Sequence, residues 1–314
     1  MTIRTWALAL LMTCGLGAST ALAESGSSAG APATQGNAGE RQAAEPPSVD
    51  WTRGPAHVEL GKDIAQLELP EGYSFANPDD ARTILQSMGN RPSGNELGLL
   101  IPNAEDQDWF IVFSWQPLGY VKDDDKDKID ADALLESIRE GTEEGNAWRK
   151  ENNIPALHVV GWAEPPRYDE RTHNLVWATL AESEGGGRSV NYNMRLLGRH
   201  GMVSAILVED PELLARTKPF AYAAMDKFSF KPGSMYSEWK PGDKVAEYGL
   251  TALVAAGAGA TAAKLGLFGF LAKLFAKAGK ALVFGAVALV AAFGKMWNAI
   301  RGKSGTGSSQ PPQP

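Results

Sequence analysis

The chain has 314 residues, of which 44% are apolar and 21% charged, and it contains a single cysteine. Residues 51–247 hold 33 acidic and 21 basic residues, a net charge of −12, whereas residues 248–314 hold seven basic residues and no acidic one. An acidic central region repels phosphates, which argues against a nucleic-acid partner. The basic and apolar C-terminal region indicates anionic lipid instead.

Residues 1–23 have the features of a secretory signal peptide. Arg4 supplies the positive end, residues 6–16 form the apolar stretch, and Ala21-Leu22-Ala23 gives the small-x-small pattern before the cleavage point. We therefore expect export, with a mature chain that begins at Glu24.

Cleavage at that point would remove Cys14, the only thiol, which excludes disulfides and thiol catalysis in the mature protein. The alternative is a lipoprotein, because residues 11–14 loosely match a lipobox, although Thr13 is large for the position before an acylated cysteine. Residues 24–50 are rich in Ala, Gly, Ser, Pro, Gln and Glu, which predicts a disordered linker.

The region 51–247 mixes the alternation typical of strands with the spacing typical of helices, which predicts one exported domain of the α+β class. Strands are expected at 57–60, 64–69, 97–101, 109–115, 157–163, 174–182, 189–197 and 202–208, and helices at 78–88, 130–150 and 211–227. Short turns rich in Gly and Pro join the later strands, which predicts an antiparallel meander sheet with flanking helices. Trp109 and Trp115 are six residues apart on one strand, so both should face the core.

Several runs of residues resemble those of a known group of bacterial proteins. The runs are residues 92–98, 119–124, 161–166, 191–193 with 195–198, and 241–249. In these runs the sequence is similar to bacterial membrane-anchored proteins grouped as the domain of unknown function 2167 family, from Trp51 to the end of the apolar tail. The resemblance implies an envelope location and a C-terminal anchor, and it implies no known activity. The order of elements is also similar to that of small domains of the photosystem extrinsic-subunit type, which implies a fold alone.

An acidic run at residues 123–127 has the spacing of the first calcium ligands of an EF-hand loop. Lys128 stands where the loop needs Gly, however, and Leu134 where it needs Glu. We therefore expect a solvated loop whose negative charge favours the N-terminus of the helix near Asp130, with calcium as the alternative.

No metal site is expected elsewhere. The four histidines, His57, His158, His173 and His200, are isolated from one another in sequence, although a zinc site assembled from separate strands stays open. No cofactor is expected, because residues 257–262 fit the dinucleotide-binding fingerprint but have no strand before them and no acidic residue about 20 positions on.

A polar site at one end of the sheet is one interpretation of four side chains: Glu164, Tyr168, Tyr192 and Arg195. Loops at one end of a rigid sheet often carry function. The alternative, which we favour, is that Pro165-Pro166 ends a strand and that Tyr192 and Arg195 are partners in the strand ladder.

Residues 248–300 are expected to associate with the membrane as an apolar helical hairpin, before a disordered end at 301–314. Uncharged runs cover 248–263, 265–272 and 281–294, and each is shorter than the ~20 residues that cross a bilayer. If Lys264 is tolerated, 248–272 could span and 281–300 could return. The competing interpretation is a helix in the plane of the membrane. The anchor residues on either interpretation are Lys264, Lys273, Lys277, Lys280, Lys295 and Trp297.

Two functions follow from these expectations. The first is a non-catalytic binding or scaffold protein on the bacterial inner membrane, with its main domain facing the periplasm. Its partners would be the lipid bilayer and an envelope protein. The second is an envelope hydrolase with a spatially assembled active site, which is less favoured because no nucleophile-base pair is evident in the sequence.

Overall fold

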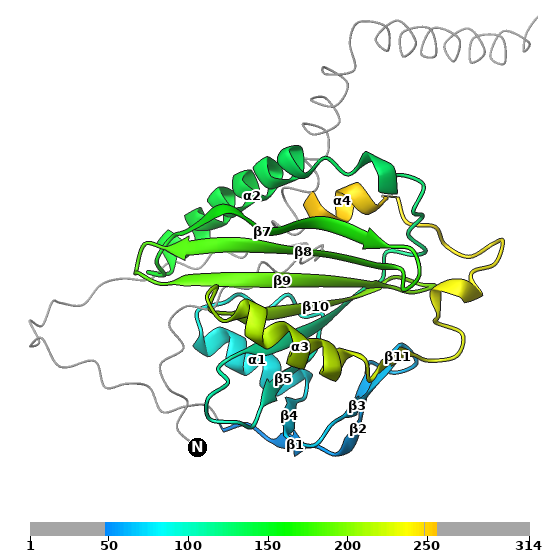
Figure 1. Cartoon of the computed structure of the whole chain (residues 1–314), viewed down its shortest axis with the longest axis horizontal. Coiled ribbons are helices and arrows are strands. Elements are labelled where there is room, and N and C mark those ends of the chain that lie inside the picture. Colours follow the sequence, from blue (N-terminus) through cyan, green and yellow to red (C-terminus); the bar gives the residue numbers. More distant parts are fainter. Residues whose placement is uncertain (1–47, 248, 256–314) are drawn as a thin grey trace, which may run out of the picture. The chain divides into compact units, whose positions relative to one another are not determined.

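The computed structural model describes residues 48–247 and 249–255, which form an α+β domain built on two antiparallel sheets (Figure 1). The larger sheet has eight strands, and β7 to β10 form the predicted meander. In spatial order its strands are β1 (Trp51–Arg53), β4 (Tyr73–Ala76), β5 (Glu96–Pro102), β6 (Phe110–Gln116), β10 (Met202–Glu209), β9 (Arg188–Leu197), β8 (Asn174–Ser183) and β7 (Leu157–Asp169).

The smaller sheet has three strands in the order β11 (Phe228–Phe230), β3 (Ala65–Leu69) and β2 (Ala56–Leu60). β2 and β3 form an antiparallel hairpin with its turn at residues 61–64. The short strands β1, β4 and β11 were not predicted, because three or four residues are too few to show a strand period.

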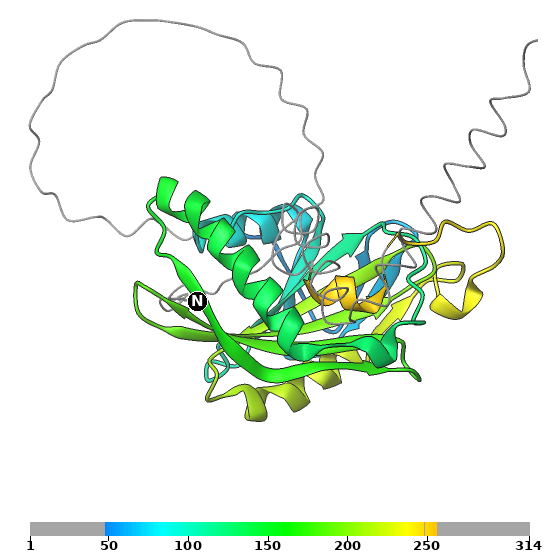
Figure 2. The same ribbon diagram turned by 90° about the horizontal axis from the view of Figure 1, so that it is seen from above.

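Three helices lie where the sequence predicts them: α1 (Pro78–Ser87), α2 (Ala131–Glu151) and α3 (Leu214–Met225). The side chain of Asn77 accepts hydrogen bonds from the backbone N–H groups at the start of α1, and Asp130 does the same for α2. Figure 2 shows α2 on one side of β7 and β8 and α3 on the other. A short fourth helix, α4 (Leu250–Ala255), packs beside α2.

The main hydrophobic core lies where one face of the larger sheet meets α3 and the three-stranded sheet. Trp109 is fully buried in it and Trp115 packs against it, which confirms that both face the core. A second cluster, centred on Ile84 and Leu85 of α1, covers the opposite face of β5, β6 and β10. Both faces of the middle strands are therefore buried.

The double proline at 165–166 does not end a strand, so that expectation is wrong. Both prolines lie within β7, which continues to Asp169 and forms the edge of the larger sheet. An edge strand tolerates proline because the missing N–H group need not face a neighbouring strand. The register between β7 and β8 shifts on either side of Glu164, as expected where such residues interrupt a ladder.

Four predicted segments lie wholly or mostly outside the described residues: the signal peptide, the linker except for residues 48–50, the membrane hairpin after residue 255, and the disordered end at 301–314. The predicted anchor residues all lie after residue 255 and so outside the described part: Lys264, Lys273, Lys277, Lys280, Lys295 and Trp297. Within residues 48–247 and 249–255, no helix has the length and apolar character needed to cross a bilayer.

A candidate binding pocket at the end of the large sheet

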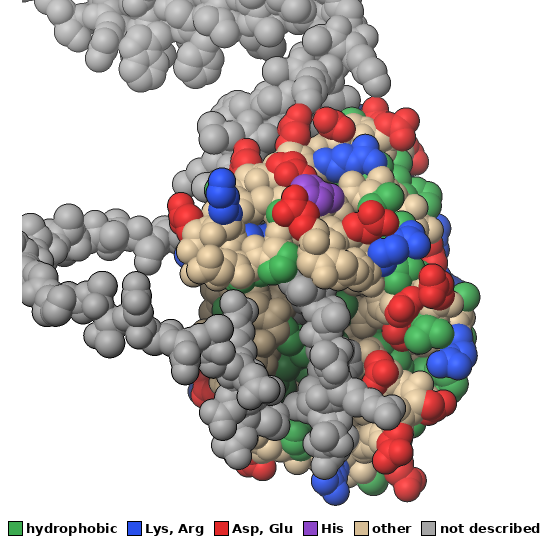
Figure 3. All heavy atoms as spheres, turned by 90° about the vertical axis from the view of Figure 1, so that its left-hand side faces the viewer, with side chains coloured by type: hydrophobic (Ala, Val, Ile, Leu, Met, Phe, Trp, Pro, Cys, Tyr) green, Lys and Arg blue, Asp and Glu red, His purple; other side chains and the backbone are tan. Residues whose placement is uncertain are grey.

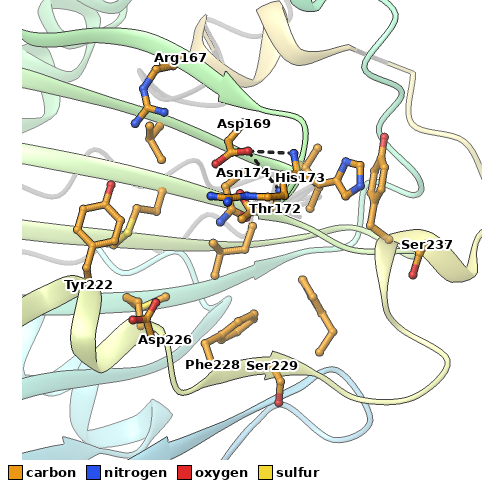
Figure 4. A pocket seen from close by; sticks show the side chains of 18 residues that line it. Arg167, Asp169, Thr172, His173, Asn174, Tyr222, Asp226, Phe228, Ser229 and Ser237 are labelled. Atoms are coloured by element: carbon orange, nitrogen blue, oxygen red, sulfur yellow. Dashed lines mark hydrogen bonds between the residues drawn. The ribbon is translucent and has the colours of Figure 1, made fainter.

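A pocket of about 790 Å³ opens where the β7–β8 turn, α3, β11 and the short helix η2 (Tyr236–Glu238) meet. Its floor is apolar and includes Val176, Met194, Leu196, Met225, Phe228 and Phe230. Its polar lining includes Arg167, Arg171, Asp226, Ser229 and Ser237. Figure 4 shows Arg167 and Asp169 on the β7–β8 side of the hollow, with Tyr222 and Asp226 on the α3 side.

The apolar floor forms because every second side chain of a strand points to the same face of the sheet. Val176 of β8 and Met194 of β9 are paired across the ladder, and both point to the face that α3 covers. The β7–β8 turn forms the rim of the pocket. Its conformation is held by the carboxylate of Asp169, which accepts hydrogen bonds from the backbone N–H groups of Arg171 and Thr172, at 2.9 and 3.4 Å. These bonds lower the pKa of Asp169.

His173 lies at the end of this turn with a positive φ of 54° and belongs to a network with Tyr168 and Asp123. The hydroxyl of Tyr168 lies 3.1 Å from Asp123 Oδ2 and 3.0 Å from His173 Nδ1. An ionised carboxylate only accepts, so Tyr168 donates to Asp123, and His173 must donate from Nδ1 to the tyrosine oxygen. This arrangement fixes the tautomer of a neutral His173, with Nε2 as the acceptor nitrogen.

A stack of aromatic rings begins with His173 and Tyr236, which both line the pocket. The His173 ring lies 4.2 Å from that of Tyr236, Tyr236 lies 4.4 Å from Tyr120, and Tyr120 lies 5.2 Å from Trp239. The Tyr236 hydroxyl donates to the carbonyl of Val121 at 2.8 Å, and burial raises the pKa of Tyr236. His173 and Tyr236 therefore form the wall at this end of the pocket, and Tyr120 stacks behind Tyr236.

A second polar cluster adjoins the pocket through Tyr222. The hydroxyls of Tyr222 and the buried Tyr192 are 2.5 Å apart. The ammonium group of Lys218 lies 4.8 Å from the centre of the Tyr192 ring and donates to Glu164 Oε1 at 2.6 Å. Burial first, and then the Tyr222 hydroxyl, raise the pKa of Tyr192.

The four predicted site residues therefore occupy three places. Glu164 and Tyr192 share Lys218 beside the pocket, and Tyr168 lies in the His173 network. Arg195 lies on the opposite face of β9, over the Trp177 ring at 4.8 Å and in a hydrogen bond to Ser204. Tyr192 and Arg195 are both ladder residues, as the alternative interpretation predicted.

The acidic run does more than form a solvated loop. Asp123 accepts from Tyr168, and the carboxylate of Asp125 accepts three hydrogen bonds from the first residues of α4. Within the part of the chain that the structure describes, no group of three or more His, Cys, Asp or Glu side chains is arranged to hold a metal ion.

Residues 232–247, which we call the strap, run past the aromatic stack toward α4. The Tyr120 N–H donates to the carbonyl of Lys244, and the Ala246 N–H donates to the carbonyl of Tyr120, both at 2.8 Å. A further bridge joins Gly198 to Met235 of the strap. Three of the runs that carry the family resemblance thus meet at this end of the domain: residues 119–124, residues 195–198 and the part of the last run at 241–247.

The family model described as "Protein of unknown function (DUF2167)" matches residues 52–290. The chain belongs to this family. The match covers most of the span over which the resemblance was expected, and it confirms the expected family. No functionally curated protein matches the sequence.

Solved structures similar to the chain include the following two. The solution structure of cyanobacterial PsbP (CyanoP) from Synechocystis sp. PCC 6803 is 10% identical, covers 62% of this chain and 99% of its own, and has a TM-score of 0.33. The Ran-binding protein Mog1p of Saccharomyces cerevisiae is 11% identical, covers 58% of this chain and 96% of its own, and has a TM-score of 0.29.

Proposed function

We propose that the protein is a non-catalytic binding module of the bacterial envelope, which recognises a partner polypeptide through the pocket at the end of the large sheet. The pocket is the observation that carries this proposal. Its floor is apolar, its lining holds both charge signs, and a fixed histidine and an exposed tyrosine stand at its edge. An apolar centre within a polar rim is the usual anatomy of a site that binds a protein segment.

The charges favour a peptide over a simple anion. Arg167 and Arg171 on the β7–β8 side are matched by Asp226 at the end of α3. A segment that places an apolar side chain on Phe228 and Phe230, with charged neighbours of both signs, would satisfy floor and rim together. The partner would be another envelope protein.

The signal at residues 1–23 and the tail at 248–300 support export and attachment to the inner membrane. Leu250, Leu253 and Val254 are buried in α4, with exposed fractions of 0%, 3% and 0%. In this conformation the membrane segment would start after Ala255 rather than at Tyr248.

Site-specific photo-crosslinking in the native host tests the proposal. A photoreactive side chain is placed at Ser229 or Ser237, which are exposed and line the pocket, and at Gln86, an exposed position on α1, as the control. We expect a protein adduct of defined mass from the pocket positions alone, weakened by Arg167→Glu. The proposal fails if the pocket positions give no adduct, or the same adducts as Gln86.

A further inference from the structure

The three-stranded sheet ends at the pocket. β11 is the last strand of that sheet, and its three residues, Phe228, Ser229 and Phe230, all line the pocket. Figure 4 shows Phe228 and Ser229 across the hollow from Asp169 of the β7–β8 side. The apolar face of the small sheet packs against the large sheet in the main core. The pocket therefore lies along the free edge of the small sheet.

The backbone of β11 presents hydrogen-bonding groups at that edge. The Glu68 N–H of β3 donates to the carbonyl of Lys227 at 3.1 Å, so these two residues form a hydrogen-bonded pair. Such pairs recur at every second residue of an antiparallel ladder. Phe228 and Phe230 fall between them, so their N–H and C=O groups point away from β3. Among the described residues, none forms a hydrogen bond with these four groups.

The side chains of β11 alternate between the core and the solvent. Phe228 and Phe230 both pack against the main core, with ring centres 5.1 Å apart, and Ser229 between them is exposed. A strand paired with β11 would share this alternation, because neighbouring strands of a sheet have the same pleat. One set of its side chains would then point toward the floor at Met194 and Leu196, and the other toward solvent.

We propose that the partner segment binds in an extended conformation and adds a fourth strand to the small sheet along β11. This inference rests on the proposed function, that the pocket binds a polypeptide. An extended segment has free backbone donors and acceptors to meet those of β11, whereas a helix pairs its own backbone groups internally. Main-chain hydrogen bonds supply affinity, and the floor selects apolar side chains at alternate positions.

The length and charges of the site define the segment further. β11 offers only the N–H and C=O groups of two residues, so strand pairing must be combined with burial of side chains on the floor. Asp226 precedes β11, and Arg167 and Arg171 lie on the β7–β8 side. A short segment with alternating apolar residues, basic near Asp226 and acidic near the two arginines, fits these features.

Phe230→Pro and Phe230→Ala are a matched pair of variants. Both remove the ring, but only proline also removes the N–H that would face the added strand. The bonds to β3 use the neighbouring residues, and an edge strand tolerates proline at such a position. The full chain, in its native host, carries a photoreactive side chain at Ser237. We expect the adduct of Phe230→Pro to be about fivefold weaker than that of Phe230→Ala, as for the loss of one hydrogen bond.

Hydrogen exchange of the unmodified full chain gives a second measurement, which is independent of any effect of proline on folding. The probe is a synthetic peptide with the sequence of the segment recovered in the Ser237 adduct. Binding should slow exchange of the Phe228 and Phe230 amides by about tenfold or more. The Ser229 amide, which the ladder already pairs with β3, should change little.

The failures of the two proposals are distinguishable. If the peptide binds but exchange at Phe228 and Phe230 does not change, the segment binds as a helix or through side chains alone, and strand addition is wrong. Equal adducts from Phe230→Pro and Phe230→Ala lead to the same conclusion, and in both cases the pocket still binds a polypeptide. If no adduct forms at Ser229 or Ser237, the proposed function fails and strand addition fails with it.

Discussion

The guanidinium of Arg199 and the carboxylate of Asp243 form a two-pronged ion pair, with Nε–Oδ2 and Nη2–Oδ1 distances of 2.7 and 2.9 Å. The pair joins the β9–β10 turn to the strap, and both side chains are largely shielded, with exposed fractions of 13% and 11%. Asp243 also accepts the Lys240 N–H at 2.9 Å. This one carboxylate therefore fixes the strap beside the aromatic stack.

Asp243→Asn should lower the Tm and loosen the strap. Arg199 first, and then the Lys240 N–H, lower the pKa of Asp243 below its ordinary value of 3.8. The contribution is thus fully present above pH ~4 and is lost as the pH falls through the lowered pKa. Acid unfolding should therefore be less steep in Asp243→Asn. Asp106→Asn, an exposed position, is the control, and equal acid profiles for all three proteins would contradict the prediction.

The ion pairs of His158 should stabilise the domain less as the pH rises. Its Nδ1 lies 2.8 Å from Glu143 of α2 and its Nε2 lies 3.4 Å from Glu184, and these carboxylates raise its pKa above 6.5. Acidic side chains are spread over the face of the molecule that Figure 3 shows.

A raised pKa means that the contribution is complete below pH ~6.5 and is lost as the pH rises through the folded-state value. His158→Gln should flatten the dependence of Tm on pH in that window. The effect should be small because the groups are about half exposed, and 1 M salt should suppress it in the unmodified protein. An NMR titration that places the pKa of His158 at or below 6.5 would refute the explanation.

Gly98 should tolerate no side chain, whereas Gly94 should tolerate one at modest cost. At Gly98 φ is +146°, and an added Cβ would lie 2.7 Å from the carbonyl oxygen of Ala76 and closer still to the Phe75 ring. Gly98→Ala should therefore destabilise the domain by at least about 3 kcal/mol. Gly94 has a φ of +83° and open space around it, so Gly94→Ala should cost about 1 kcal/mol. Urea unfolding of the two variants measures the difference.

The long strands and helices were predictable because their periodicity is local. Residues 189–197 alternate between polar and apolar side chains, residues 174–182 and 202–208 are short, mostly apolar runs bounded by turn residues, and Asp130 marks a helix start that can be read in the sequence. The part of β7 that follows the double proline was missed. A strand can contain proline when it lies at the edge of a sheet, and the sequence of one strand does not show whether it lies at an edge.

The site was less predictable because its members are far apart in sequence. Asp123 and Tyr168, which share a hydrogen bond, are 45 residues apart in the sequence, and Tyr236 and Val121, which share another, are 115 residues apart. Tyr222 is exposed on an ordinary helix, and nothing in its sequence surroundings marks it as the partner of Tyr192. The run 119–124 was visible as a signal, but its role depends on the strap folding back on it.

Replacing Tyr168 with phenylalanine should allow neutral His173 to adopt either tautomer without unfolding the domain. In the unmodified protein the Tyr168 hydroxyl donates to Asp123 and accepts from His173, so neutral His173 must carry its proton on Nδ1. The phenylalanine ring would keep the packing but lack the hydroxyl oxygen. His173 would then be free to carry its proton on either nitrogen, and Asp123 would lose a donor.

Nitrogen NMR of the imidazole rings separates the two tautomers directly. We expect His173 of the unmodified protein to show a protonated Nδ1 and an unprotonated Nε2, and Tyr168→Phe to show a mixture. His200→Gln is a useful companion, because His200 is exposed and contacts the carbonyl of Gly233 elsewhere on the strap, so its loss should leave the His173 signals in place. A proton on Nε2 of neutral His173 in the unmodified protein would mean that Tyr168 donates to the histidine instead. Asp123 would then have to be protonated or without that hydrogen bond, and the acceptor assigned to the edge of the pocket would be wrong.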